Sequence, residues 1–355
     1  MSLKARLEAR VLQEGPLTVA DYMTACLHDP AGGYYAVRPG LGAEGDFVTA
    51  PLVTQMFGEL VGLWAAETWT RLGAPAPFRL VEMGPGDGTL MSDLLRAARL
   101  VPPFLAGADL WLVETSAPLR AAQAARLAGA APRWAASLDE VPRGAPVVLV
   151  ANELLDCLPA RQFVRTARGW MERRVGLDAA GRLAFGLAPA PNGFEGPADA
   201  PEGLVVERSP AQEALGAALG ARVTEDGGCA LLIDYGRAEP GVGDTLQALR
   251  RHRKEDPLAA PGEADLTVHA DFPAVAAAAR AAGAAVSPIR SQAGFFRALG
   301  IEQRAAALAG ARPDRAGTIA RQLARLTAPD EMGELFKVLA IHAPGLAVPG
   351  LEERS

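Results

Sequence analysis

Apolar positions in the middle of the chain form short unbroken runs separated by stretches with helical spacing. The unbroken runs are FRLVEM (78–83), DLWLVE (109–114), PVVLVANE (146–153) and CALLIDYG (229–236). Runs of this length, rich in Val, Leu and Ile, are typical of strands buried on both faces. Between them, residues 89–100 and 117–128 have helical spacing. Strands alternating with crossover helices predict an α/β fold with a mostly parallel sheet covered by helices on both faces.

The N-terminal part of the chain has a different pattern, which predicts a helical extension around a loop. An apolar stripe of Leu3, Leu7 and Val11 recurs at helical spacing near the start. Residues 29–51 are rich in glycine and proline, which excludes a regular element there. Helical spacing resumes in QMFGELVGLWAAETWTRLG (55–73). There Met56, Leu60, Leu63 and Trp64 are expected to share one buried face.

Between residues 161 and 207 short strand-like segments replace the alternation, with a turn at 178–181. This favours an antiparallel insertion into the α/β core. The apolar run ELFKVLAIHAP (334–344) predicts a last strand at or beside the sheet edge. The predicted parts are an N-terminal helical region with a lid loop (1–75), the first part of the core (76–157), an inserted substrate-side region (158–226) and the remaining core with helical additions (227–355).

Composition permits a sizeable core and limits the partners. The chain has 355 residues, 50% of them hydrophobic, and a net charge of −6 from 35 basic and 41 acidic residues. This length fits one large elaborated α/β domain or two closely packed domains. The acidic balance argues against a broad nucleic-acid-binding face, so no nucleic acid partner is expected.

Cysteine usage and the N-terminus bear on the compartment. Cys26, Cys157 and Cys229 are odd in number and isolated, which excludes a disulfide framework and zinc-like spacing and favours a reducing compartment. No apolar stretch is long enough to span a membrane. The N-terminus lacks the apolar segment of a signal peptide, and Glu8 and Glu14 are unusual for a transit peptide. These features predict a cytoplasmic protein without a membrane span.

A glycine-rich turn, GPGDG (84–88), follows the first of the four strands. A P-loop needs a Lys after its last glycine, and Gly88 is followed by Thr89 and Leu90. A dinucleotide fingerprint needs its third glycine three positions after the second, where Thr89 stands instead. The spacing is Glu82-x-Gly84-x-Gly86-x-Gly88, and an acid at the strand end suits a cationic ligand better than a pyrophosphate. The turn therefore favours S-adenosylmethionine as cofactor.

Acids near the ends of the next strands support an adenosine-binding site. Glu114 ends the second strand, where a carboxylate bridges ribose hydroxyls in related sheet architectures. Asp139 follows a third strand and could accept from the adenine amino group. A tight strand–helix turn with solvated acids is the alternative interpretation of the same pattern.

The strand before ANELLDCLPARQF (151–163) places further polar residues at the expected ligand edge. If a helical turn follows Asn152, the side chains of Glu153 and Asp156 face the same way. Two carboxylates could hold a guanidinium in a bidentate manner. The alternative interpretation of the same two acids is a helix N-cap and a surface acid without a role in binding. Cys157 is expected to be a buried small residue, because no histidine lies nearby in sequence.

Motifs along nearly the whole chain resemble the MidA-like family of S-adenosylmethionine-dependent methyltransferases. The motifs are YMTACLHDPAGGYY, GDFVTAPLVTQMFGEL, LVEMGPGDGTLMSDLLR, ANELLDCLPARQF, LLIDYG, GDTLQALRRH, PGEADLTVHADF and MGELFKVLAI. The resemblance implies a class I (Rossmann-like) methyltransferase core with an added substrate-side region. It also implies protein arginine methylation, namely symmetric dimethylation of a respiratory complex I subunit, and a role in assembly of that complex.

Site residues follow from the resemblance by position. The cofactor glycines fall on Gly84, Gly86 and Gly88, the ribose acid on Glu114, the loop over the site on Asp46 and Thr49, and the catalytic Asn-Glu…Asp motif on Asn152, Glu153 and Asp156. The sequence departs from the family pattern at Asp87, where Arg or Lys is usual. It also departs at SQAGFF (291–296), which leaves the contribution of Gln292 open.

Other residue groups allow alternative functions. Metal ligands are one possibility for Asp265, His269 and Asp271, which occupy alternating strand positions, although no metal is expected. Asp234 ends another strand and could lie at the ligand crevice. The alternatives to an arginine methyltransferase are an RNA or DNA amine methyltransferase and an assembly chaperone that binds S-adenosylmethionine without catalysis. The expected partner is a protein substrate, acted on by a monomer or a homodimer.

Overall fold

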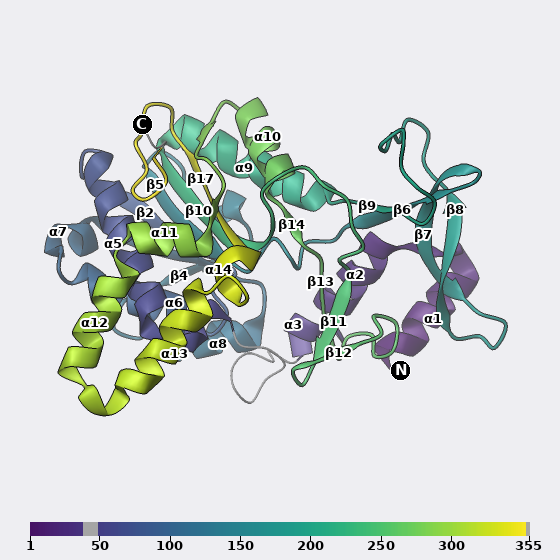
Figure 1. The fold of residues 1–355 in the computed structure, drawn as a ribbon, viewed down its shortest axis with the longest axis horizontal. Helices are drawn as coiled ribbons and strands as arrows, with labels where there is room; N and C mark the ends of the chain where they lie inside the picture. The colour runs from purple at the N-terminus through teal and green to yellow at the C-terminus, as the bar shows by residue number, and fades with distance from the viewer. Residues whose placement is uncertain (38–48, 353–355) are drawn as a thin grey trace. The chain divides into compact units, whose positions relative to one another are not determined.

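The computed structural model describes residues 1–37 and 49–352 (Figure 1). The chain forms two compact units, each assembled from three separate stretches. Unit 1 comprises Met1–Phe47, Leu155–Gln212 and Glu239–His269. Unit 2 comprises Val48–Leu154, Glu213–Ala238 and Ala270–Ser355.

Unit 2 is built on a mostly parallel sheet. Its strands are β2 (Phe78–Met83), β3 (Ala108–Val113), β4 (Arg133–Ala135), β5 (Val147–Asn152), β10 (Gly228–Arg237), β14 (Ala270–Asp271), β15 (Ala285–Val286), β16 (Arg290–Ser291) and β17 (Phe336–His342). The order is β15-β17-β10-β5-β2-β3-β4, with β14 beside β10 and β16 beside β17. Figure 1 labels β17, β10, β5 and β2 of this sheet. The strands β10, β5, β2, β3 and β4 are mutually parallel, and β17 runs antiparallel to β10. All six residues of β5 are buried, as expected for a strand covered on both faces.

Helices surround this sheet. They are α4 (Ala50–Val53), α5 (Gln55–Arg71), α6 (Thr89–Ala98), α7 (Pro102–Gly107), α8 (Ala117–Arg126), η1 (Leu138–Glu140), α9 (Pro210–Asp226), α10 (Phe272–Ala281), α11 (Gln292–Ala298), α12 (Ile301–Ala311), η2 (Pro313–Arg315), α13 (Ala316–Thr327) and α14 (Met332–Leu335). Alternate residues of β5 and β10, among them Val150 and Leu231, join Phe57 of α5 and Leu94 of α6 in one core. Strands β10 and β17 also contact α10.

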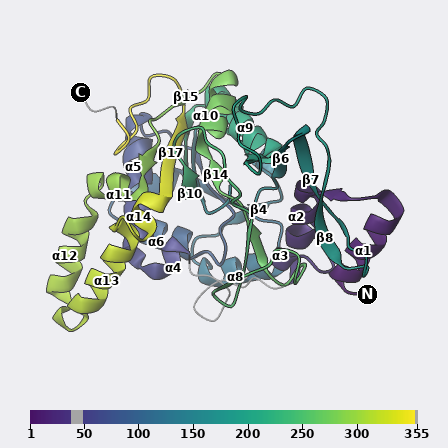
Figure 2. The ribbon, with the colours of Figure 1, turned by 45° about the vertical axis from the view of Figure 1, so that its right-hand side comes forward.

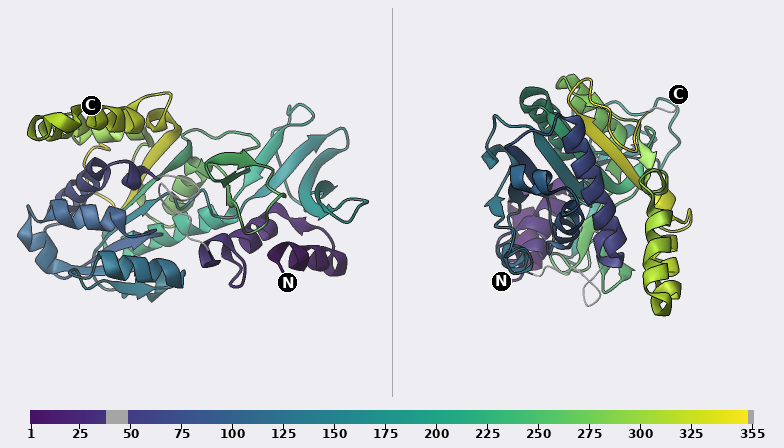
Figure 3. Two further views of the ribbon diagram at one scale, coloured as in Figure 1. Left: turned by 90° about the horizontal axis from the view of Figure 1, so that it is seen from below. Right: turned by 90° about the vertical axis from the view of Figure 1, so that its left-hand side faces the viewer.

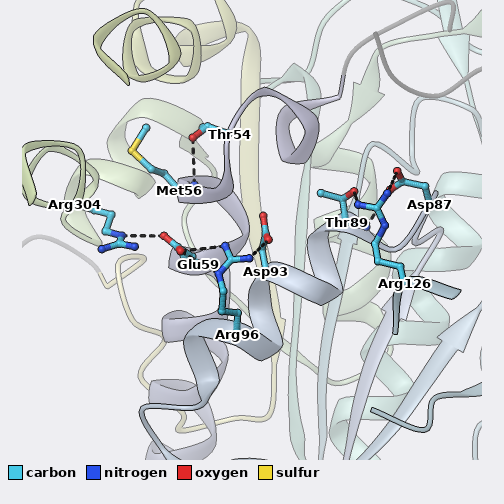
Figure 4. Close-up of polar contacts among 9 residues, drawn as sticks. All are labelled: Thr54, Met56, Glu59, Asp87, Thr89, Asp93, Arg96, Arg126 and Arg304. Atoms are coloured by element: carbon cyan, nitrogen blue, oxygen red, sulfur yellow. Dashed lines mark hydrogen bonds and ion pairs between the residues drawn. The ribbon is translucent and has the colours of Figure 1, made fainter. Parts of the chain in front are cut away.

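Helices α5 and α6 pack closely because α5 carries glycine at the contact. A Cβ atom on Gly62 would lie 2.6 Å from the carbonyl oxygen of Leu94. Beside this contact, buried Glu59 of α5 accepts from Arg96 of α6 at 3.0 Å and from Arg304 of α12 at 2.8 Å (Figure 4). The α12–α13 hairpin, the yellow-green helical pair in Figure 3, is thereby tied to α5.

Unit 1 combines short helices with antiparallel strands. Its elements are α1 (Leu3–Glu14), β1 (Leu17–Thr18), α2 (Val19–His28), α3 (Tyr34–Val37), β6 (Arg161–Thr166), β7 (Gly169–Leu177), β8 (Leu183–Pro189), β9 (Val205–Arg208), β11 (Gln247–Arg250), β12 (Arg253–Glu255) and β13 (Asp265–Thr267). One sheet has the order β1-β7-β6-β9 with β8 on β7, and another has the order β12-β11-β13. Helices α1 and α2 contact β7 (Figure 2). The predicted stripe Leu3, Leu7 and Val11 is the buried face of α1.

The predicted α/β class with an N-terminal extension and an antiparallel insertion is confirmed, and the four main strands begin and end within one residue of the predicted runs. The expectation that Leu63 shares the buried face of α5 is wrong, because its side chain is 39% exposed. The four-part domain division remains a prediction.

Candidate cofactor site and active site

The carboxyl ends of β3, β2 and β5 form the topological switch point of the sheet. From β2 the chain continues to β3 and β4 on one side, whereas β5 lies on the other. The register pairs Met83 with both Val113 and Ala151. The glycine turn, Glu114 and the Asn152–Glu153 pair therefore lie at neighbouring strand ends. Open α/β sheets bind their ligands at such a reversal of strand order.

Three left-handed glycines shape the turn after β2. Gly84, Gly86 and Gly88 have φ angles of 64°, 55° and 83°. Gly84 donates its N–H to the carbonyl of Val113 at 3.1 Å, and Gly88 occupies the N-cap position of α6. A Cβ atom on Gly84 would lie 3.1 Å from Cδ1 of Leu154, so the turn has little room for a side chain there. The turn keeps backbone groups accessible at the N-terminus of α6, as a polar cofactor requires.

Glu82 precedes the turn as a deeply buried acid. Its side chain is 2% exposed, and its Oε2 has no hydrogen-bond partner. Burial, reinforced by the charge of Asp87, raises the pKa of Glu82 well above its usual range. A hydrogen bond from the backbone N–H of Met91 in α6 opposes this shift. An unpaired buried carboxylate oxygen fits a site that accommodates a cationic group.

Glu114 follows β3 with its carboxylate already oriented. Its Oε1 accepts the backbone N–H of Ser116 at 2.8 Å, and its Oε2 accepts Nε2 of Gln123 at 3.4 Å. Burial raises the pKa of Glu114, and these hydrogen bonds oppose the rise. An oriented carboxylate at this strand end fits a ribose diol.

The remaining predicted cofactor residues are Asp139, Thr49 and Asp46. Asp139 is exposed in η1 after β4. Thr49 is half-buried and precedes α4. Asp46, and residues 38–48 of the region predicted to contain the lid loop, lie outside the described residues. The roles of these residues remain predictions.

Asn152 and Glu153 form a preorganised pair at the end of β5. Nδ2 of Asn152 donates to Oε1 of Glu153 at 2.9 Å, and the backbone N–H of Ala50 donates to the same oxygen at 3.1 Å. Glu153 has a φ of 52°, a left-handed conformation that is costly for a residue with a side chain. The Oδ1 atom of Asn152 is buried and has no hydrogen-bond partner. Strain and an unpaired polar atom at a ligand edge are typical of a functional site.

Asp156 belongs to unit 1 and Glu153 to unit 2. The expected helical turn carrying both residues is wrong, since residues 153–158 form bends and turns and Glu153 is left-handed. Within unit 1, the carbonyl of buried Asp156 accepts the N–H of Val268 at 2.9 Å. Tyr35 donates from Oη to Oδ1 of Asp265 at 3.0 Å. Burial, followed by the charges of Asp265, Cys157 and Asp156, raises the pKa of Tyr35 well above its usual range.

Sequence patterns did not identify Gln123 or Tyr35 as site residues, and they singled out Asp265 only as a possible metal ligand. Gln123 interrupts an otherwise apolar stripe with Leu119 and Leu127 at i, i+4 and i+8, which is the available signal. Gln292, whose role was open, is buried in α11 and donates to the carbonyl of Leu326 at 2.9 Å. Among residues 1–37 and 49–352, no group of three metal-binding side chains comes together.

Comparison with known proteins assigns the family. Residues 60–289 match the family model described as "Putative S-adenosyl-L-methionine-dependent methyltransferase". The chain belongs to this methyltransferase family. This agrees with the resemblance to MidA-like proteins, so the cofactor of the family is S-adenosylmethionine and the chain is an enzyme of the methyltransferase class.

Relatives of this methyltransferase cover most of its length. It is 33% identical to "Protein arginine methyltransferase NDUFAF7 homolog, mitochondrial" of Drosophila melanogaster, over 99% of this chain and 87% of that protein. It is 34% identical to the Homo sapiens protein arginine methyltransferase NDUFAF7, over 94% of this chain and 81% of that protein. A crystal structure of a COG1565 superfamily member from Burkholderia thailandensis, bound to S-adenosyl-homocysteine, matches with a TM-score of 0.83 and 31% identity, over 99% of this chain and 92% of that one.

The prediction of a cytoplasmic location is wrong, because these animal relatives are named as mitochondrial proteins. Unpaired cysteines indicate the redox state of a compartment and do not distinguish one reducing compartment from another. In the described part of the chain, no helix is long and apolar enough to cross a membrane.

Proposed function

We propose that this methyltransferase modifies an arginine side chain of a protein substrate, a subunit of respiratory complex I, and thereby aids assembly of that complex. The observation that carries the proposal is the fixed carboxylate of Glu153. It lies at the end of β5, next to the strand that leads into the glycine turn, and receives hydrogen bonds from Asn152 and Ala50. The names of the NDUFAF7 relatives support arginine as the target.

The chemistry of a guanidinium explains why carboxylates are needed. Its pKa is above about 12, so it arrives charged and its nitrogen lone pairs are delocalised. Glu153 would hold one of its nitrogens, concentrate the positive charge away from the attacking nitrogen and accept the proton late in the reaction. For Asp156, the second acid of the family motif, a part in binding the substrate is proposed from the resemblance alone. Asn152 would keep the Glu153 carboxylate oriented through the hydrogen bond it donates.

S-adenosylmethionine would supply a methyl group from its sulfonium: the S–C bond breaks as the new N–C bond forms, and the neutral thioether is the leaving group. Glu82, the three glycines and Glu114 would hold this cofactor, with Asp139 near the adenine, and the resemblance adds Thr49. The contribution of the protein is alignment of the nitrogen with the methyl carbon and exclusion of water. The complex I substrate follows from the resemblance to the MidA-like family.

Labelled methyl transfer tests the proposal directly. The purified protein and radiolabelled S-adenosylmethionine are added to a lysate of cells that lack the protein, and the labelled bands are identified by mass spectrometry. We expect methylarginine in a complex I subunit. Label on lysine, on nucleic acid or on no macromolecule would overturn the assignment.

A further inference from the structure

Helix α8 connects the two halves of the cofactor site through one buried amide. Gln123 is 0% exposed. Its Nε2 donates to the carbonyl of Gly86 at 2.7 Å and to Oε2 of Glu114 at 3.4 Å. Gly86 belongs to the turn after β2, and Glu114 follows β3. One side chain therefore contacts both the glycine turn and the acid expected to bind ribose.

Trp134 of β4 determines the direction of this amide. Its indole Nε1 donates to Oε1 of Gln123 at 2.8 Å. An indole N–H can only donate, so the amide oxygen has to face Trp134 and the NH₂ group has to face Gly86 and Glu114. The reversed amide would present its oxygen to a carbonyl and a carboxylate, both of which are acceptors.

Arginines three residues before and after Gln123 strengthen the same arrangement. Arg120 donates from Nε to the carbonyl of Glu114 at 2.6 Å and from Nη2 to that of Ala135 at 3.2 Å. Arg126 pairs with Asp87 of the glycine turn at 2.9 Å and also donates to Thr89 (Figure 4). Residues spaced by three lie near one another on a helix. One side of α8 therefore contacts the glycine turn, Glu114 after β3 and Ala135 at the end of β4.

We propose that Gln123 is a positioning residue that couples the ribose-binding half of the cofactor site to the glycine turn, with Trp134 setting its orientation. Both N–H groups of this one planar amide are used, one toward the turn and one toward the Glu114 carboxylate. A displacement of either group weakens the hydrogen bond to the other, so the two halves contribute to cofactor affinity as one unit. The proposal rests on the cofactor of the family and is independent of which substrate accepts the methyl group.

Calorimetry with S-adenosylhomocysteine measures this coupling. Gln123→Met keeps length and volume but removes both donors, and we expect affinity to fall about 10- to 100-fold. Trp134→Phe retains Gln123 but frees its amide to rotate, and we expect a loss of about 3- to 10-fold. A double-mutant cycle of Gln123→Met with Glu114→Gln should be non-additive by at least about fivefold, because both changes disrupt the same unit.

A buried glutamine elsewhere provides the matched control. Gln292 is also 0% exposed and donates Nε2 to a backbone carbonyl, that of Leu326. Gln292→Met should lower the Tm while leaving affinity for S-adenosylhomocysteine within about twofold, and its cycle with Glu114→Gln should be additive. An additive cycle for Gln123, or equal affinities of the two Met variants, would overturn the proposal. If Gln123→Met does not fold, the proposal is overturned when Trp134→Phe binds S-adenosylhomocysteine as tightly as the wild type.

Discussion

The side-chain amide of Asn152 donates a hydrogen bond to the carboxylate of the next residue, Glu153, at 2.9 Å. The backbone of Glu153 is left-handed, which costs on the order of 1–3 kcal/mol for a residue other than glycine. The fold therefore maintains one direction for this carboxylate against local strain. Such an arrangement is expected where the carboxylate has to meet a substrate.

Glu153→Gln tests this role, because it keeps the size of the side chain and removes its charge. We expect methyl transfer to fall by about 10²–10⁴-fold, while affinity for S-adenosylhomocysteine changes less than about twofold. Single-turnover transfer and calorimetry measure the two effects. Glu67→Gln, at an exposed ion pair with Arg71 on α5, is the control and should retain full activity. Complete rescue of complex I assembly by Glu153→Gln without arginine methylation would instead indicate a chaperone.

Glu114→Ala tests the ribose site. We expect the cofactor to lose about 1–3 kcal/mol of binding free energy, since two charge-assisted hydrogen bonds disappear. Calorimetry with S-adenosylhomocysteine measures the loss, and NAD should not bind to either protein. Glu225→Ala, at an exposed ion pair with Arg143, should bind like the wild type. Unchanged affinity of the Glu114 variant, or tight binding of NAD, would contradict the assigned site.

Glu82 should make the stability of the ligand-free protein depend on pH. Burial raises its pKa in the folded state, so the folded protein retains the proton at pH values where the unfolded chain has lost it. The free energy of unfolding should therefore fall as pH rises from the unfolded pKa through the folded pKa. Thermal unfolding measured between pH 5 and 8 should show a smaller fall for Glu82→Gln than for the wild type. If the free energy of unfolding changes with pH equally in the two proteins, the pKa of Glu82 is not raised. Because Gln cannot become negative, this variant should also bind S-adenosylmethionine more weakly.

Gly84→Ala tests the geometry of the turn. The left-handed backbone and the 3.1 Å approach to Leu154 both oppose a Cβ atom. We expect the free energy of unfolding to fall by about 1–2 kcal/mol, together with cofactor affinity. Denaturant unfolding and calorimetry measure the two effects. Gly129→Ala is the control, because nothing lies within 4 Å of its Cβ position and its φ is not left-handed. If both variants lose the same stability, conformational strain at Gly84 is not the cause.

The sequence by itself determined the strands, the change from a parallel core to an antiparallel insertion, and the glycine-rich turn expected to bind the cofactor of the family. A strand that is buried on both faces has apolar residues at consecutive positions, as in PVVLVANE, so a segment of eight residues is enough to predict it. The glycine spacing after Glu82 is equally local, because a backbone that turns away from a strand needs its glycines at particular positions. For the same reason Glu114 and Asn152 could be located at strand ends before any contact was known.

Only the tertiary structure decided which groups these residues meet. Leu63 matches the apolar stripe of α5, yet its exposure depends on which elements cover that side of the helix. Glu153 has a left-handed backbone at the end of β5, and its carboxylate accepts the N–H of Ala50, a residue 103 positions earlier. Gln123 contacts Gly86, 37 residues away, because the order β5-β2-β3-β4 brings the turn and α8 together. Periodicity reports the face on which a side chain lies, whereas its hydrogen-bond partner is set by the elements that pack there from distant parts of the chain.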